Sequence, residues 1–186
     1  DRAVLDQASR WARAYLRDPS AVHPSLVATA LGLAALGGDV ALFDDYRVRF
    51  ERAKTPADRS RFLAALGDFR DPKVVDRALA YSLTGPLRPQ ETNRIANSLR
   101  TEPVLRDRTY RWMAENYAAI AARVPAFVLP DLVYFASGCS LERLERARAF
   151  FADSTHRVAG TGAEFEKERE GASISRFLAQ AAAEAP

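Results

Sequence analysis

Leu87-Arg88-Pro89-Gln90-Glu91-Thr92 and Tyr110-Arg111-Trp112-Met113-Ala114-Glu115-Asn116-Tyr117 are the two stretches that decide the fold. Both lie within residues 85–138, which begin with a Gly-Pro break and end at a glycine. Apolar residues around them recur at three- and four-residue spacing, which is typical of amphipathic helices. We therefore predict one helix over residues 87–99 and a longer helix over residues 103–124.

The same pattern extends to the rest of the chain, and no stretch predicts a β-strand. Breaks between apolar segments carry capping side chains, often followed by proline, which favours the first turn of a helix. Asp39, Thr55, Asp71 and Ser140 are the residues expected to cap helices in this way. The other predicted helices span residues 2–17, 24–36, 129–137 and 163–183.

Helices joined by short breaks predict an all-α protein, an α-solenoid of about ten antiparallel helices with a HEAT- or armadillo-like superhelix. The spacing alone is equally compatible with a globular helical bundle, because no strict repeat period is present. We expect one helical-repeat domain over residues 1–186. Since the sequence begins at Asp1 without a methionine, we expect an excised domain or a processed chain, and the family resemblance described below implies that it is a C-terminal fragment of a larger chain.

The composition excludes few functions, but it limits the kinds of partner that the chain is expected to bind. The net charge is +3, and acidic residues are interspersed among the arginines, so nucleic-acid binding is not favoured. No apolar run reaches the 18 or so residues needed to cross a bilayer, and no membrane span is expected. Cys139 is the only cysteine, so no intrachain disulfide can form. The compartment is left open, with a soluble cytoplasmic protein favoured.

The two opening stretches, at their separation, resemble the C-terminal helical domain of the M1 family of zinc aminopeptidases, of the puromycin-sensitive and endoplasmic-reticulum type. In that family, an Arg-x-Gln-Asp segment opens one helix and a Trp-x-Phe-x-x-x-Asn-Trp segment lies in the next. Further matching pieces follow in the family's order over roughly residues 1–178. They are Phe62-Leu63-Ala64-Ala65-Leu66-Gly67, Asp71-Pro72, Glu142-Arg143-Leu144 and Phe150-Phe151.

The chain departs from the family pattern at several positions. The aspartate after glutamine is Glu91, the second tryptophan is Tyr117, and an Asn-x-x-Trp-Leu segment is reduced to Phe177-Leu178. Arginine far outnumbers lysine, which indicates a GC-rich genome, so a distant bacterial member is the expectation.

The resemblance implies that the parent chain is a zinc-dependent aminopeptidase that removes N-terminal residues from peptides. This part would cover the active site and enclose the substrate cavity, so its partners would be the catalytic domain of the same chain and the peptide. Zinc is expected in the parent and not in this fragment, which lacks a His-Glu-x-x-His motif. Its only histidines, His23 and His156, lie far apart. We therefore expect neither catalytic nor metal-binding residues here, and no activity from the fragment alone.

Candidate peptide-binding residues lie on the predicted helix over residues 87–99. Its buried side is expected to be formed by Thr92, Ile95, Ala96 and Leu99. The opposite side carries Gln90, Asn93, Arg94 and Asn97, with Arg88 as a further candidate. Amides and guanidinium groups without a carboxylate suit hydrogen bonding to peptide carbonyls or to a terminal carboxylate.

Two alternatives stay open at this point. The same polar side chains could cap helices or bond between helices without touching a ligand. The whole chain could instead be a stand-alone HEAT-like scaffold that binds another protein, or less readily a nucleic-acid backbone.

Overall fold

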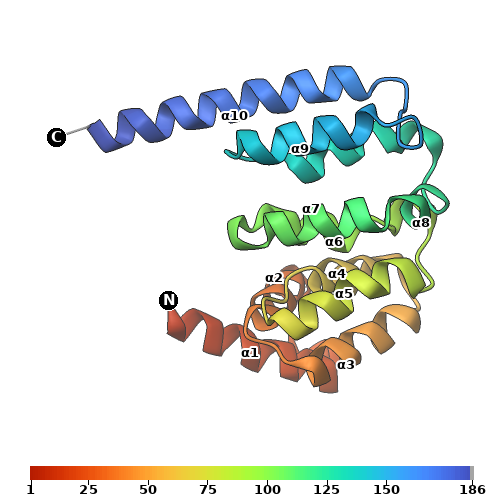
Figure 1. Cartoon of the computed structure of the whole chain (residues 1–186). Helices are drawn as coiled ribbons and strands as arrows, with labels where there is room; N and C mark the ends of the chain where they lie inside the picture. The colour runs from red at the N-terminus through yellow and green to blue at the C-terminus, as the bar shows by residue number, and fades with distance from the viewer. Residues whose placement is uncertain (185–186) are drawn as a thin grey trace. The chain divides into compact units, whose positions relative to one another are not determined.

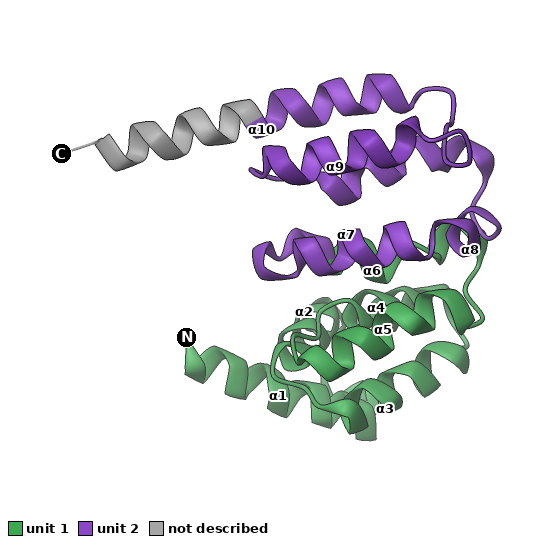
Figure 2. Ribbon diagram, viewed as in Figure 1, with its two compact units in different colours: residues 1–99 green, residues 100–186 purple. Residues whose placement is uncertain are grey.

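The computed structural model describes the backbone of residues 1–184 and the side chains of residues 1–172. Every regular element in that part of the chain is helical, which confirms the predicted all-α class (Figure 1). The helices form two compact units, Asp1–Leu99 and Arg100–Pro186 (Figure 2). The single domain over residues 1–186 stays a prediction. Phe177 and Leu178, which carry part of the resemblance, lie outside the described side chains.

The first unit contains paired α-helices and two short 3₁₀ helices. Its elements are α1 (Arg2–Arg17), η1 (Pro19–Ala21), α2 (Pro24–Leu36), α3 (Val40–Glu51), α4 (Pro56–Leu66), α5 (Pro72–Thr84), η2 (Pro89–Glu91) and α6 (Arg94–Thr101), within which the unit ends. Helix α1 packs on α2, and α3 packs on α4. Because residues 52–55 are the only link between α3 and α4, these two helices run antiparallel.

The predicted capping residues begin the helices as expected. Oδ1 of Asp39 accepts a hydrogen bond from the Leu42 backbone N–H at 2.9 Å, and Oγ1 of Thr55 accepts one from Asp58 at 3.1 Å. Each bond satisfies a backbone donor that the first helical turn leaves unpaired. Proline follows directly at the start of α4, where its missing N–H costs nothing.

Aromatic side chains form the core of the first unit. Phe43, Tyr46 and Phe50 of α3 are fully buried. The ring of Phe69, which follows α4, meets the rings of Phe43 and Tyr46 edge to face, with centroids 5.5 and 5.8 Å apart. Such edge-to-face pairs add stability beyond the burial of the rings themselves. The aromatic residues of α3 and Phe69 therefore fix how α3 packs on α4.

The second unit follows the sequence prediction less closely. Its elements are η3 (Pro103–Leu105), α7 (Arg106–Glu115), α8 (Tyr117–Ala121), η4 (Ala126–Ala136), α9 (Leu141–Ala152) and α10 (Thr161–Glu184). The continuous helix predicted over residues 103–124 is wrong, because it is interrupted at Asn116. The Asn116 side chain donates to the Trp112 carbonyl at 2.8 Å, and such a local bond competes with the helical ladder.

The α-helix predicted over residues 129–137 is also wrong, since this segment is a long 3₁₀ helix, η4. Its buried residues Leu132 and Phe135 are three positions apart, as are Val133 and Ala136, which matches three residues per turn. Pro130 lies inside η4 and has no N–H to donate. Helices α7, α9 and α10 all pack on η4, which makes it the centre of the second unit.

Trp112 and Tyr117 are buried in the second unit. The Trp112 ring lies 6.3 Å from that of Phe135 in η4. Tyr117 packs edge to face on Phe151 of α9 at 5.9 Å, and Phe151 in turn contacts Phe165 of α10. The motif that carries the family resemblance is therefore a packing motif in this chain.

Candidate functional site

The five candidate peptide-binding residues do not share one helical stripe. The predicted helix over residues 87–99 is wrong in its first half, because η2 occupies residues 89–91 and α6 begins only at Arg94. Arg88 and Gln90 are exposed and precede α6, Asn93 lies in the turn before it, and Arg94 and Asn97 lie on it. The candidates thus separate into two groups.

Glu91 explains why the helix starts late. Its carboxylate accepts the backbone N–H of Arg88 at 2.9 Å and two hydrogen bonds from the Arg59 guanidinium on α4, at 2.9 and 2.7 Å. The Arg59 guanidinium lowers the pKa of Glu91, and partial burial opposes this. Glu91 therefore holds η2 against α4, and residues 88–90 continue from this anchor.

Arg94 and Asn97 line a small polar pocket at the end of α4. The cavity has a volume of about 250 Å³. Its other lining residues are Ala64, Asp68 and Ser98. The close approach of α6 to the end of α4 depends on Gly67, because a Cβ at that position would lie 2.6 Å from the Ser98 Cβ. The structure thus brings Arg94 and Asn97, two of the five predicted residues, together with Asp68, which the sequence interpretation did not include.

Asp68, which follows α4, adds a carboxylate to the pocket that Arg94 and Asn97 line. Its Oδ1 accepts a hydrogen bond from the Ser98 hydroxyl at 3.1 Å. Burial raises the pKa of Asp68, while the Ser98 hydroxyl and the charge of Arg70 act in the opposite direction. The pocket therefore combines hydrogen-bond donors from Arg94 and Asn97 with an acceptor from Asp68. Such a set can pair with both the N–H and the C=O of a peptide unit.

Asn93 precedes Arg94 in the chain but does not line this pocket, and its side chain has an unused acceptor. Its Oδ1 is buried and accepts no hydrogen bond from the described residues. A buried carbonyl oxygen without a donor is costly, so a ligand N–H or a water molecule at this position would be stabilising.

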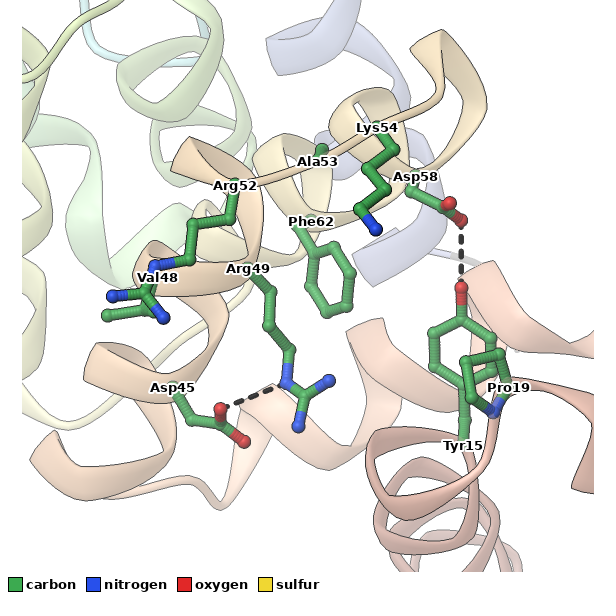
Figure 3. Close-up of a pocket in the computed structure, with 10 residues that line it drawn as sticks. All are labelled: Tyr15, Pro19, Asp45, Val48, Arg49, Arg52, Ala53, Lys54, Asp58 and Phe62. Carbon is green, nitrogen blue, oxygen red and sulfur yellow. Dashed lines mark hydrogen bonds and ion pairs between the residues drawn. The ribbon is translucent and has the colours of Figure 1, made fainter.

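Two other pockets lie in the first unit. One, of about 550 Å³, lies where the end of α1 meets α3 and α4, and it contains several charged side chains (Figure 3). The other is an apolar pocket of about 360 Å³ between α1 and α2. Its lining includes Val4, Trp11 and Leu26, each between 38% and 52% exposed.

Metal binding finds no support among the described side chains. No group of three His, Cys, Asp or Glu residues there is arranged to hold an ion. Nδ1 of His23 lies 2.8 Å from the Ser25 hydroxyl at the start of α2, and the His156 ring stacks on Phe150 at 3.9 Å. Neither histidine has the second imidazole that a zinc site of the expected kind requires. Also, no helix in the described part has both the length and the apolar content for crossing a bilayer.

Comparison with models of protein families gives a match. The model of a family described as "ERAP1-like C-terminal domain" matches residues 1–173, and thus includes both compact units. No curated protein matches the chain.

Proposed function

The chain belongs to the ERAP1-like C-terminal domain family, and on this basis we propose that it is the non-catalytic C-terminal domain of an M1 zinc aminopeptidase of the puromycin-sensitive type. Its role would be to cover the active site and to enclose the cavity that holds the peptide substrate. The observation that carries this proposal is the family match over residues 1–173. The ordered sequence motifs around Trp112 support the same reading.

The zinc ion of such an enzyme would be held outside this chain. The described residues do not fit a zinc site, because His23 and His156 are engaged separately and neither belongs to a group of three possible metal ligands. This chain would therefore contribute to binding the peptide and not to breaking its bond.

The polar pocket at the end of α4 is the proposed point of peptide contact. Arg94 and Asn97 would donate hydrogen bonds to peptide carbonyl oxygens, and Asp68 would accept one from a peptide N–H. The buried Oδ1 of Asn93 lies outside the lining of this pocket, and an N–H group that reached it would give this oxygen the donor it lacks. Arg88 and Gln90 do not line this pocket, but both are exposed and precede α6 in the chain. The Arg88 backbone N–H donates to Glu91, which fixes this segment, so both side chains would contact a longer peptide.

The proposal is tested in the full-length parent enzyme with the substitution Arg94→Gln. The kinetics of a decapeptide and of a single-residue aminoacyl-nitroanilide are measured side by side. We expect the KM for the decapeptide to rise about three- to tenfold, because one charge-assisted hydrogen bond is lost. The nitroanilide, which is too short to reach beyond the catalytic centre, should be hydrolysed with unchanged kcat/KM.

Arg13→Gln is the matched control, since Arg13 is an exposed arginine on α1 outside all three pockets. A decapeptide KM unaffected by Arg94→Gln would contradict the peptide contact. An open reading frame that encodes no His-Glu-x-x-His segment upstream of Asp1 would contradict the aminopeptidase assignment itself.

A stand-alone protein-binding scaffold is the second candidate function. The apolar pocket between α1 and α2 favours it, because Val4, Trp11 and Leu26 expose apolar surface of the kind found at protein interfaces. In that case the parent gene would lack the zinc motif, and Trp11→Ser would abolish capture of the partner without affecting any peptide hydrolysis.

A further inference from the structure

Exposed apolar side chains gather on the first two helices. Seven large apolar side chains are exposed in the described part of the chain, and four of them, Val4, Leu5, Trp11 and Leu26, lie on α1 and α2. Val4, Trp11 and Leu26 border the apolar pocket between these helices, which the proposed peptide contact does not use. A partner that reached this side of the first unit would therefore bury the three side chains together.

The sequence of α2 explains why this surface is apolar. No residue of Pro24–Leu36 is charged. A helix without charged residues is usually covered on all sides. Helix α2 packs on α1 and α4 but leaves Ser25, Leu26 and Thr29 exposed. Its exposed side thus lacks the charges that normally keep a helix surface in contact with water.

Helix α1 places positive charge beside this apolar surface. Arg10, Arg13 and Arg17 recur at three- and four-residue spacing, so they lie along one side of α1, and all three are exposed. Arg10 donates a hydrogen bond to Gln7, which lines the apolar pocket, so this row of arginines lies at the edge of the pocket. Asp6 is the only acidic residue within α1, and neither Arg13 nor Arg17 forms an ion pair with a described residue.

The combined surface of α1 and α2 complements a membrane better than a second copy of this chain. A two-fold contact through this surface would bring the arginine rows of two α1 helices together, with only Asp6 to offset their repulsion. A bilayer with anionic headgroups offers hydrocarbon to the apolar side chains and negative charge to the arginines. The indole of Trp11 also suits the boundary between headgroups and acyl chains.

The size of the pocket favours lipid over a docked protein helix. Its volume is about 360 Å³, which is near the lower limit for a binding site. A helix bound in a groove inserts a row of side chains over several turns, and this pocket has little room for such a row. Acyl chains have no fixed shape and need no preformed groove.

We propose that the surface formed by α1 and α2 attaches this chain to a membrane that contains anionic lipid. Helix α1 would lie parallel to the membrane, with Trp11 and Leu26 among the acyl chains just below the headgroups. Arg10, Arg13 and Arg17 would pair with the phosphate and carboxylate groups of the headgroups. Such attachment is peripheral and reversible, because it depends on a small apolar area and a few charges.

The first test measures binding of the 186-residue chain to vesicles by sedimentation. One set of vesicles is pure phosphatidylcholine, and the other also contains a large fraction of phosphatidylserine. We expect binding to the acidic vesicles to be about tenfold tighter or more, because each arginine near an anionic surface adds to the attraction. A higher salt concentration should weaken this binding, because salt screens the attraction.

Contact between Trp11 and the acyl chains is measured by fluorescence quenching with lipids that carry bromine on their chains. The wild-type protein should be quenched and Trp11→Phe should not, because the other tryptophan, Trp112, is buried in the second unit. Trp11→Phe keeps an aromatic side chain and should still sediment with the acidic vesicles. A loss of quenching would then report the position of Trp11 and not a loss of binding.

The double substitution Arg13→Gln and Arg17→Gln should weaken binding to the acidic vesicles about tenfold or more. The matched control is Arg111→Gln with Arg157→Gln, because these two arginines are exposed in the second unit and the change in charge is the same. Leu26→Ser, with its folding checked by circular dichroism, should also weaken binding, because it removes apolar surface from the contact.

Three results would overturn the proposal: equal binding to neutral and acidic vesicles, an affinity unchanged by the Arg13 and Arg17 double substitution, or no quenching of the wild-type protein. Absence of vesicle binding would also overturn it, and association of the chain with itself or with a protein partner would then assign this surface to a protein interface. None of these results bears on the hydrolysis of soluble peptides by the parent enzyme, which tests the proposed function separately.

Discussion

Replacing Glu91 with glutamine should lower the stability of the first unit more than any other change of one carboxylate to an amide. The Glu91 carboxylate receives two hydrogen bonds from Arg59 and one from the Arg88 backbone. Both charged side chains are shielded, with 17% of Arg59 and 14% of Glu91 exposed. Arg59 also lies 4.0 Å above the Phe50 ring, so it cannot turn toward water without losing that contact.

The expected loss follows from these contacts. Removing one partner of a fully buried ion pair costs about 3–5 kcal/mol, because the remaining charge is left unpaired. Glutamine keeps one acceptor oxygen, and the pair is partly exposed, so we expect Glu91→Gln to cost about 2–3 kcal/mol. Glu145→Gln, at an exposed position of α9, should change the free energy of unfolding by less than about 0.5 kcal/mol.

The assay is urea unfolding followed by circular dichroism between pH 7 and pH 3. Because Arg59 depresses the pKa of folded Glu91 below its unfolded value of about 4.5, the pair contributes fully above that value. Its contribution is lost as the pH falls through the folded pKa. The difference in unfolding free energy between wild type and Glu91→Gln should therefore be constant near neutral pH and shrink below about pH 4.5.

A loss of unfolding free energy below about 0.5 kcal/mol for Glu91→Gln at pH 7 would refute this reasoning. Such a value is typical of a solvated ion pair, and a pair that weak would not hold η2 against α4. A difference that grows in acid would refute the sign of the pKa shift.

Three further predictions concern the second unit and the whole chain. Trp112→Ala should cost about 3–5 kcal/mol through the cavity left beside Phe135, and an unchanged denaturation midpoint would contradict the core position of Trp112. Gly138→Ala should cost about 1–3 kcal/mol in thermal unfolding, because φ is +107° at this position and a Cβ would lie 2.8 Å from Arg106. Gly171→Ala in α10 is the control and should be neutral or slightly stabilising, because a Cβ there would meet no other atom within 4 Å. The purified chain should not hydrolyse an aminoacyl-nitroanilide with or without zinc, and metal-dependent release of nitroaniline would contradict the placement of catalysis elsewhere.

The sequence was most informative where helices begin. Asp39, Thr55, Asp71 and Ser140 were predicted as caps, and each accepts the expected backbone hydrogen bond. Such bonds link residues two or three positions apart, so a local pattern is sufficient to predict them.

The same reasoning failed where a distant side chain decides the local structure. The late start of α6 depends on Glu91 pairing with Arg59, which is 32 positions away in the chain. The break at Asn116 is local, but the presence of an asparagine within a helix does not show which backbone carbonyl its side chain will bond. The break could therefore not be predicted from this residue alone. Spacing could have indicated η4, because Leu129, Leu132 and Phe135 recur every three residues.

The candidate site was predicted only in part for a related reason. Arg94 and Asn97 share one face of α6, and the helical period brings them together without further information. Asp68 and Ser98 complete the pocket from two segments that meet only in the folded chain. Asp68 follows a glycine at the end of a helix, so sequence alone suggests a solvated turn residue and not a buried acceptor.

The 3₁₀ geometry of η4 has a consequence for how this family can change length. Each turn of η4 uses three residues and advances about 6 Å, whereas an α-helix restores the same facing side chains only after about seven residues. A deletion or insertion of three residues in η4 would remove or add one full turn. The apolar side chains equivalent to Leu132 and Phe135 would then still face the neighbouring helices. Homologues are therefore expected to tolerate gaps in multiples of three at this segment, and gaps of one or two residues should be rare there.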